Sequence, residues 1–336
     1  MIVSSRKALI MSVLITCYSR KEFIVKAVNS VLNQTIDRSA YEIIVSKNYK
    51  DADIDTFLKK NHCKIIFDER CGIGVRLAGL IRAAESDILV FLEDDDYFKE
   101  NKLEKIFNIF KDPEVHYVNN AYLTIDHNGN YLSIDHKQVD GNAWKISSPV
   151  DSFYIMRKLF KKKLYFSMSN ISIRKFMILE YIDVLSRIQV EPDFFMFVRA
   201  LQYKGVLTYY PATLTVWRLH SSTSVASGPR DELLKKRKDF WSFVKSDLEV
   251  QTLASERSAS KKLIYCVYSE AITHNMVLAN SQFNKIDIII RVTKSFALLR
   301  NKHFFILLIL ALFGSICPVK TSLIYSKYLL TKAPKM

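Results

Sequence analysis

Cysteine is scarce in this chain of 336 residues, and the five cysteines present are scattered. They lie at Cys17, Cys63, Cys71, Cys266 and Cys317, so their number is odd and no Cys-x-x-Cys pair occurs. Structural zinc sites and disulfide frameworks both need regularly spaced cysteines, so this pattern argues against both kinds of site. Reduced intracellular thiols are the simplest interpretation.

Acidic residues are also in short supply, because 34 Asp and Glu stand against 49 Lys and Arg and give a net charge of +15. Residues 230–336 hold 18 basic and 8 acidic residues, whereas residues 1–229 hold 31 and 26. This asymmetry predicts an anionic surface as a partner of the C-terminal third, either lipid or nucleic acid. A nucleic-acid-binding protein would need basic and aromatic residues interleaved on the N-terminal part, which is nearly neutral. We therefore expect no nucleic-acid partner.

A long apolar run is missing as well. The longest run, Phe304–Phe313, lies in an uncharged stretch that ends before Lys320, whereas a spanning helix needs about 20 apolar residues. Residues 271–336 carry 9 Lys and Arg against 1 acidic residue. A hydrophobic helix flanked by basic amphipathic ones is typical of an anchor on anionic lipid, with a buried core helix as the alternative. Whether residues 303–319 span the bilayer or only dip into it stays open.

These features predict three regions: an N-terminal domain over residues 1–225, a helical amphipathic extension over residues 226–300, and a membrane-anchoring tail over residues 301–336. The N-terminus shows no secretory signal, because the apolar stretch Ala8–Thr16 is short and leads into a polar loop. We expect a peripheral or monotopic protein on the cytoplasmic face of the cell membrane.

Residues 1–225 contain alternating strand and helix patterns. Strands are expected at Met11–Ile15, Glu42–Val45, Lys64–Phe67, Ile88–Leu92 and Val115–Val118, and helices at Glu22–Gln34, Val75–Glu85 and Lys99–Phe110. Farther on we expect a hairpin over Ala121–Ile134, helices over Ser152–Lys163, Lys175–Val184 and Asp193–Lys204, and strands over Val206–Tyr209 and Leu214–Arg218. This alternation predicts an α/β fold with a mostly parallel, Rossmann-like sheet flanked by helices.

Four acidic residues, Glu93-Asp94-Asp95-Asp96, directly follow the apolar run Ile88–Leu92. The run is typical of a strand buried on both faces, and α/β sheets bind ligands at the carboxyl ends of such strands. Because adjacent carboxylates repel one another, a divalent cation would stabilise them, and hard oxygen ligands suit Mg²⁺ or Mn²⁺. The alternative is a solvated turn in which Asp96 caps the next helix. The buried strand favours the metal site.

Four further residues suited to chemistry are expected at the same sheet edge or near a helix start. Thr16 and Tyr18 follow the first strand, where a ring can stack on a nucleobase and a hydroxyl can hydrogen-bond it, although Tyr18 packing on the next helix is equally consistent. Arg76 opens a helix, where a cation gains nothing from the dipole, which indicates an anionic ligand unless the residue is an ordinary exposed arginine. Asp193 begins an apolar helix and suits either a general base or an N-cap.

The order of these segments resembles the family 2 glycosyltransferases, which have the GT-A fold. The resemblance covers about residues 10–225 and rests on segments in the family's order: Ser12–Arg20 with Ala27–Thr35, Tyr41–Val45, Gly72–Arg76 with Gly79, Phe91–Asp96 as the "DxD" region, Glu191-Pro192-Asp193 with Arg199, and Trp217-Arg218-Leu219-His220. It implies transfer of a hexosyl group from a nucleotide-sugar donor with inversion at the anomeric carbon.

The resemblance also implies roles for individual residues. Asp193 becomes the general base, Asp95 the metal ligand with Asp94 toward the ribose, and Glu93 a supporting residue, although which of the four carboxylates does what stays open. Asp96 and His220 are further metal candidates, and Arg218 is a candidate for the diphosphate. Thr16, Tyr18, Asn48 and Arg76 are expected at the nucleotide, which is UDP- or GDP-linked. The expected acceptor is a polyprenyl-linked sugar or phosphate, or a cell-surface glycan.

Two positions depart from the family pattern. Ser46-Lys47-Asn48 stands where paired aspartates usually follow the second strand, so Asn48 can hydrogen-bond a base but offers no carboxylate. Leu77 replaces a polar residue that often follows the arginine. The first departure keeps open a rival interpretation, a degenerate protein of this fold that binds a nucleotide-sugar without turnover.

Overall fold

The computed structural model describes residues 9–19, 21–69, 72–134, 143–219, 243–244 and 246–267. The chain divides into two compact units. The first comprises Met1–Val150, Lys158–Ile188 and Pro192–Arg218; the second comprises Asp151–Arg157, Gln189–Glu191 and Leu219–Met336. The predicted tail, most of the predicted amphipathic extension and His220 lie outside the described residues.

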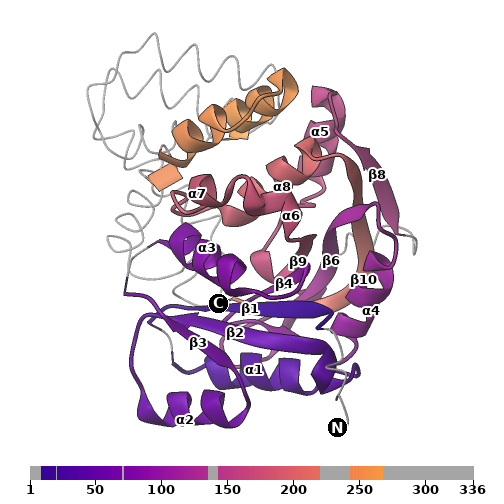
Figure 1. Cartoon of the computed structure of the whole chain (residues 1–336). Coiled ribbons are helices and arrows are strands. Elements are labelled where there is room, and N and C mark those ends of the chain that lie inside the picture. The colour runs from indigo at the N-terminus through magenta and orange to yellow at the C-terminus, as the bar shows by residue number, and fades with distance from the viewer. Residues whose placement is uncertain are drawn as a thin grey trace, which may run out of the picture. The chain divides into compact units, whose positions relative to one another are not determined.

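The first unit is built on a sheet that counts 10 strands among the described residues (Figure 1). Its N-terminal half is parallel, in the order β3-β2-β1-β4. These strands are β1 (Met11–Cys17), β2 (Tyr41–Lys47), β3 (Lys64–Phe67) and β4 (Ile88–Glu93). Apolar residues fill both faces of β1 and β4, which is the pattern that the sequence predicted for buried parallel strands.

The other half of the sheet is mixed. β9 (Ile171–Arg174) runs antiparallel between β4 and β6 (Val115–Ile125), and β10 (Gly205–Arg218) runs parallel to β6. Three short strands complete it: β5 (Tyr97–Phe98) and β8 (Trp144–Ser148) pair with β10, and β7 (Tyr131–Ile134) pairs with β6. The predicted hairpin is therefore present as β6 and β7, and Gly129 takes a positive φ of 93° in its turn.

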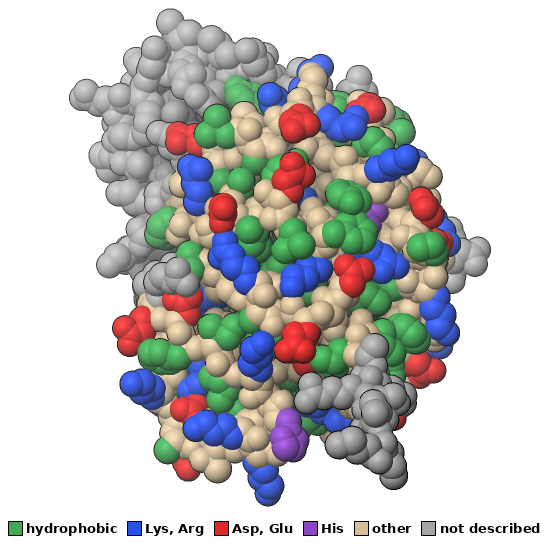
Figure 2. All heavy atoms as spheres, viewed as in Figure 1, with side chains coloured by type: hydrophobic (Ala, Val, Ile, Leu, Met, Phe, Trp, Pro, Cys, Tyr) green, Lys and Arg blue, Asp and Glu red, His purple; other side chains and the backbone are tan. Residues whose placement is uncertain are grey.

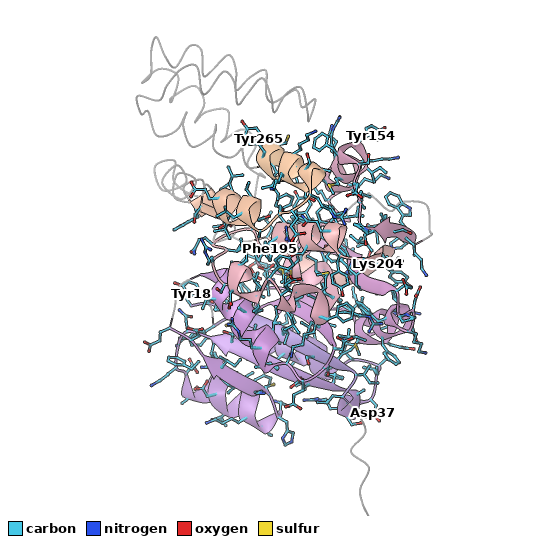
Figure 3. The ribbon with its side chains drawn as sticks, turned by 45° about the horizontal axis from the view of Figure 1, so that its top comes forward. Tyr18, Asp37, Tyr154, Phe195, Lys204 and Tyr265 are labelled. Carbon is cyan, nitrogen blue, oxygen red and sulfur yellow. The ribbon has the colours of Figure 1, made fainter. Side chains whose placement is uncertain are left out.

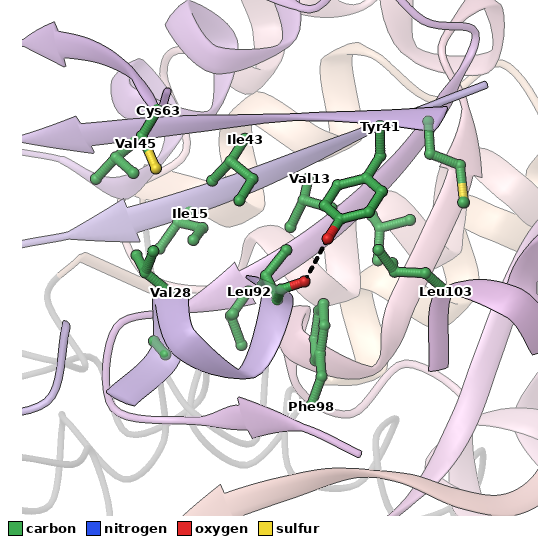
Figure 4. Packing of buried hydrophobic residues seen from close by; sticks show 14 of the residues in the cluster. Val13, Ile15, Val28, Tyr41, Ile43, Val45, Cys63, Leu92, Phe98 and Leu103 are labelled. Atoms are coloured by element: carbon green, nitrogen blue, oxygen red, sulfur yellow. Dashed lines mark hydrogen bonds between the residues drawn. The ribbon is translucent and has the colours of Figure 1, made fainter. Parts of the chain in front are cut away.

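Helices cover both faces of the sheet. α1 (Ile24–Leu32), α2 (Ala52–Lys60) and α4 (Lys102–Phe110) share one apolar cluster with the odd-numbered residues of β1 and β2. In that cluster the Tyr41 hydroxyl donates to the Val31 carbonyl at 2.7 Å (Figure 4). α3 (Ile73–Ala83) contacts β1 and β2, and α8 (Pro192–Gln202) follows two short helices, α6 (Phe176–Leu179) and α7 (Ile182–Leu185). The result is a three-layer α/β unit.

Several expected elements differ from those observed. The predicted helix Lys175–Val184 is two short helices, the two predicted C-terminal strands are one strand, β10, and α2, β5, β8 and β9 were not predicted. The register of β10 against β6 shifts between Tyr210 and Thr213, around Pro211, which lacks the N–H that a regular ladder needs. α2 escaped notice because only Ile54 and Leu58 among its residues are buried.

The second unit contains α5 (Phe153–Lys161) in part and helical segments at 246–253 and 258–267. Its buried Asp247 accepts the backbone N–H groups of Gln189, Val190 and Glu191 at 2.8, 3.1 and 3.3 Å. Within the described parts of the chain, no helix has both the length and the apolar character that crossing a bilayer requires.

Candidate functional site

Three neighbouring strands bring polar residues to one edge of the sheet. Thr16 at the end of β1 lies opposite Ser46 of β2 and Glu93 of β4. The Asp94 N–H donates to the Thr16 carbonyl at 3.1 Å, and the Tyr18 N–H donates to Asp94 Oδ2 at 3.2 Å. The ends of β1 and β4 are thereby joined, as expected for ligand residues at the carboxyl edge of a parallel sheet.

The acidic turn Glu93–Asp96 is enclosed by protein. Asp94, Asp95 and Asp96 are 1%, 8% and 2% exposed, so a solvated turn is excluded. Asp96 does not cap the next helix, because α4 begins at Lys102 with Asn101 before it. Three carboxylates with so little water around them need positive charge or hydrogen-bond donors nearby.

Arg218, at the end of β10, supplies part of that compensation. Its backbone N–H donates to Asp96 Oδ1 at 2.9 Å, and its Nε donates to the Asp95 carbonyl at 3.0 Å. Its Nη1 also donates to the carbonyls of Asp126 and His127 at 3.2 and 2.9 Å. The structure thus shows Arg218 holding the acidic turn against the β6–β7 hairpin, which is an additional role beside the expected diphosphate contact.

Lys102 supports the same turn from the interior. Its Nζ donates to the Ser169 carbonyl at 2.5 Å and to the Thr215 hydroxyl at 2.9 Å, and the Ser169 hydroxyl accepts the Glu93 N–H at 3.0 Å. Burial lowers the pKa of Lys102 well below its usual value, while the Asp96 carboxylate acts in the opposite direction. The sequence did not predict a buried lysine beneath the turn. The helix α4 also begins three residues later than expected.

Tyr18 and Arg76 form one wall of the site. The Arg76 guanidinium lies 4.4 Å from the Tyr18 ring centroid, and Arg76 is buried rather than an ordinary surface arginine. Tyr18 is 39% exposed and lies at the margin of the fold (Figure 3). An exposed ring backed by a cation offers a surface on which a nucleobase can stack.

Asn48 lies beside that wall. Its Oδ1 accepts the Ser19 N–H at 2.8 Å, and its Nδ2 donates to the Ser19 hydroxyl at 3.3 Å. Ser19 has a positive φ of 59°, so Asn48 stabilises a strained turn directly after Tyr18. Asn48 therefore shapes the loop that carries Tyr18.

The departure at Lys47 has a structural explanation. Lys47 is buried, forms an ion pair with Asp55 of α2, and donates to the Tyr49 carbonyl at 2.7 Å. Burial raises the pKa of Tyr49 above its usual range, helped by a hydrogen bond between its hydroxyl and the Cys17 thiol. The Lys47 side chain therefore has a partner within its own βα unit.

Asp193 and the acidic turn are linked through a single residue. The Ser167 N–H donates to Asp193 Oδ2 at 3.1 Å, and the Ser167 hydroxyl lies 3.4 Å from Glu93 Oε2. Ser167 has φ 61° and ψ 127°, a strained conformation for a residue other than glycine. Strain of this kind persists only where the surroundings enforce it. The structure thus brings together Glu93 and Asp193, which are 100 positions apart in the sequence.

Asp193 is the second residue of α8, so it is not the N-cap that the sequence allowed as an alternative. Burial raises its pKa to about 6, although the N–H groups of Phe194 and Ser167 hydrogen-bond its ionised form. A carboxylate that titrates near neutrality suits a general base. Arg199, quoted with it in the motif, instead directs its guanidinium to the rings of Tyr181 and Phe195, at 4.5 and 5.6 Å.

The acidic turn fits part of a metal site. Asp95 and Asp96 offer hard oxygen ligands, and Mg²⁺ is often held by one or two carboxylates together with substrate phosphates. Among the described residues no group of three or more His, Cys, Asp and Glu side chains gathers at one point. His220, the third predicted ligand, lies outside those residues. The protein would therefore hold a cation jointly with a phosphate-bearing ligand.

Comparison with known proteins gives a consistent assignment. Residues 12–182 match the family described as Glycosyl transferase family 2. A poly(ribitol-phosphate) beta-glucosyltransferase of Bacillus spizizenii is 27% identical over 168 residues, covering 46% of this chain and 25% of that protein. Uncharacterized glycosyltransferases of Rickettsia bellii and a Nostoc strain are 30% and 31% identical, over 40% and 39% of this chain. The chain spans 20% to 41% of the length of these relatives.

Solved structures share the fold. The crystal structure of S. aureus TarS 1-349 in complex with UDP-GlcNAc has a TM-score of 0.59 at 13% identity, over 94% of this chain and 89% of that one. The complex of the same protein with UDP has a TM-score of 0.57 at 11% identity, with the same coverage. The predicted GT-A-like architecture is confirmed by these similarities.

Proposed function

The chain belongs to glycosyl transferase family 2, and from this premise we propose that it transfers a sugar from a nucleotide-sugar donor to a glycan or lipid-linked acceptor with inversion. One observation carries the proposal. Hydrogen bonds of 3.1 and 3.4 Å through Ser167 connect Asp193 with Glu93, so a candidate base lies beside the acidic turn that would hold a cation for the donor diphosphate. The reaction requires both groups at one place.

Asp193 takes the proton in this mechanism. Its ionised carboxylate accepts the proton of an acceptor hydroxyl while that oxygen attacks the anomeric carbon, and the bond from this carbon to the diphosphate breaks on the opposite face. General-base catalysis of this kind contributes about 10²–10⁴-fold. The Ser167 N–H orients the Asp193 carboxylate through Oδ2 and leaves the hydroxyl of Ser167 toward Glu93.

The nucleotide is bound at the edge of β1 and β2. The Tyr18 ring, backed by Arg76, stacks on the base, Thr16 and Asn48 offer hydrogen bonds, and Asp94 lies toward the ribose. The TarS complexes with UDP and UDP-GlcNAc support UDP as the first nucleotide to test. GDP is the second, because Asn48 offers both a donor and an acceptor where the family usually has carboxylates.

Mg²⁺ or Mn²⁺ is the proposed cofactor, held by Asp95 and Asp96, with His220 as a further candidate. When bound, the cation supplies Lewis-acid stabilisation of the charge on the departing diphosphate. We expect that chelation with EDTA abolishes donor turnover and that Mn²⁺ restores it. Donor turnover that persists in EDTA after dialysis would contradict the metal requirement, while leaving the role of Asp193 intact.

Asp193→Asn tests the proposed reaction directly. The amide keeps the shape of the side chain but cannot accept a proton, so we expect turnover to fall at least about 100-fold. Nucleotide binding, measured by the thermal shift that UDP causes, should stay within about twofold of wild type, since ligand binding raises stability by mass action. Turnover near wild type would remove Asp193 from the base role.

A wild-type protein that binds UDP-glucose and UDP-GlcNAc but turns over neither would favour the rival interpretation, a degenerate protein that only binds the nucleotide-sugar. A location at the cytoplasmic face of the cell membrane belongs to the same proposal, with a polyprenyl-linked sugar or a glycan precursor as the acceptor there. The apolar run Phe304–Phe313 and the basic residues around it support that location.

A further inference from the structure

Three aromatic side chains, from strands β6 and β10 and from the loop that carries Ser167, meet near the candidate base. The rings of Tyr122 and Phe166 lie 5.0 Å apart with an angle of 33° between their planes. The Trp217 ring lies 6.2 Å from Tyr122 and 5.4 Å from Phe166, and is turned by 77° and 73° against them. Two roughly parallel rings and one nearly perpendicular ring thus form an aromatic corner.

The aromatic corner is connected along the chain to both halves of the proposed reaction. Phe166 directly precedes Ser167, whose N–H holds Asp193. Trp217 directly precedes Arg218, which holds Asp95 and Asp96. Phe166 and Trp217 are both partly exposed, whereas Tyr122, which packs against both rings, is buried. An acceptor hydroxyl that gives its proton to Asp193 has to lie within this neighbourhood.

We propose that Phe166 and Trp217, packed against Tyr122, form a stacking surface for the sugar ring of the acceptor. The inference rests on the proposed transfer reaction and specifies its acceptor, as a molecule that presents a pyranose ring at the base. The apolar C–H face of a pyranose packs on aromatic rings, which provide a large rigid contact area at low entropic cost.

Polar atoms around the corner favour a sugar over a lipid chain. The Ser167 hydroxyl directly follows Phe166 in the chain, whereas the buried Asn119 and Asn170 amides donate to the Phe166 carbonyl, at 3.4 and 3.0 Å, and fix its backbone. The Lys163 ammonium lies 5.3 Å from the Phe166 ring centroid. A surface for an alkyl chain would be lined by apolar groups, whereas a sugar needs aromatic faces and hydrogen-bonding groups side by side.

The chain provides a matched control. Trp144 on β8 is also partly exposed, packs against an aromatic side chain (Tyr209, 5.8 Å) and carries a lysine over its ring (Lys162, 3.5 Å). Because Trp144 pairs with Tyr209, which lies eight positions before Trp217 on β10, Trp144 is far from Trp217 along that strand. Trp144→Ala therefore removes a similar side chain without touching the aromatic corner.

The experiment uses the full chain saturated with UDP and two probes, methyl β-glucopyranoside and the open-chain polyol sorbitol. Binding is followed by saturation-transfer NMR. We expect saturation of the pyranoside ring protons in wild type and in Trp144→Ala, about tenfold weaker binding in Trp217→Ala, and binding within about threefold of wild type in Trp217→Phe. Phe166→Leu serves as a second variant of the corner, with the same loss expected.

Any of three results would overturn the proposal. These are binding of sorbitol as tight as that of the pyranoside, a loss of pyranoside binding in Trp144→Ala equal to that in Trp217→Ala, or full pyranoside binding in both Trp217→Ala and Phe166→Leu. Hydrolysis of UDP-glucose by water is measured in parallel, and Trp144→Ala should keep it within about twofold of wild type because Trp144 lies outside the candidate site. Absence of donor hydrolysis in wild type would contradict the proposed function. The binding data would then still decide on the stacking surface, so the two failures are distinguishable.

Discussion

The carboxylate of Asp193 is subject to opposing influences at the scale of a single residue. Burial favours its neutral form, whereas the N–H groups of Phe194 and Ser167, at 2.8 and 3.1 Å, favour its charge. Burial dominates and raises the pKa to about 6. The base is therefore ionised at neutral pH but loses its charge within a pH range where the fold is expected to persist.

This pKa predicts the acid limb of the rate profile. Because only the ionised carboxylate accepts a proton, kcat/KM should be level above pH 7 and fall about tenfold for each unit below pH 6. The measurement is donor hydrolysis or transfer between pH 4.5 and 8, with the UDP thermal shift as a control for binding. A rate independent of pH down to 5 would contradict this assignment.

Some site residues could be predicted from the sequence and others could not. Asp94, Asp95 and Asp193 could be identified from the sequence, because carboxylates after a buried strand or in the first turn of an apolar helix form a local pattern. Ser167 could not be identified from the sequence, because its positive φ and its contacts with Glu93 and Asp193 depend on packing across the sheet. Trp217 was recognised only as part of a motif, since its aromatic neighbours come from another strand, β6, and from the loop that contains Phe166.

At the scale of elements, the packing of α3 depends on one glycine. A Cβ on Gly74 would lie 2.6 Å from the Ile188 carbonyl oxygen and closer still to that of Leu185. Both are backbone atoms, so the following segment would have to move. Gly79, one and a half turns further along the same helix, has open space at its Cβ position. The two glycines therefore serve different purposes: one is needed for close approach and the other is not.

Gly74→Ala should reduce the free energy of unfolding by about 1–3 kcal/mol or more, the usual cost of overpacking. Gly79→Ala should increase it by about 0.5–1 kcal/mol, because alanine is the better helix former. Urea unfolding of both variants followed by circular dichroism checks the prediction. Equal stability of the two variants would mean that α3 does not pack as closely as the structure shows.

The elements that the sequence predicted are those with long regular patterns. The four parallel strands and helices α1, α3 and α4 have apolar periodicity that does not depend on distant partners. β9 was missed because it has only four residues and gains its place through pairing with β4 and β6. The length of β10 was missed for a related reason, since its pairing with β6 continues past the irregularity at Pro211.

At the scale of the whole molecule, charge separates the sheet domain from the C-terminal third. On the face shown in Figure 2, basic and acidic side chains are interspersed rather than gathered by sign. This agrees with the near balance of residues 1–229, where 31 basic residues stand against 26 acidic ones. The candidate site therefore lies in a domain of low net charge, while the basic excess of the C-terminal third remains available to bind an anionic surface.

The C-terminal tail is the part of the chain expected to bind that anionic surface. Residues 301–336 combine the apolar run Phe304–Phe313 with basic residues at Lys302, Lys320, Lys327, Lys332 and Lys335. Burial of the run in lipid supplies a hydrophobic contribution, and each lysine near an anionic headgroup adds about 1 kcal/mol at low salt. Deletion of residues 301–336 should therefore abolish cosedimentation with vesicles of phosphatidylglycerol.

Deletion of residues 320–336 alone keeps the apolar run and should weaken binding mainly to these anionic vesicles, with less effect on vesicles of phosphatidylcholine. Undiminished vesicle binding after the larger deletion would show that the anchor lies elsewhere in the chain. UDP thermal shifts of both deletion variants verify that the sheet domain is folded.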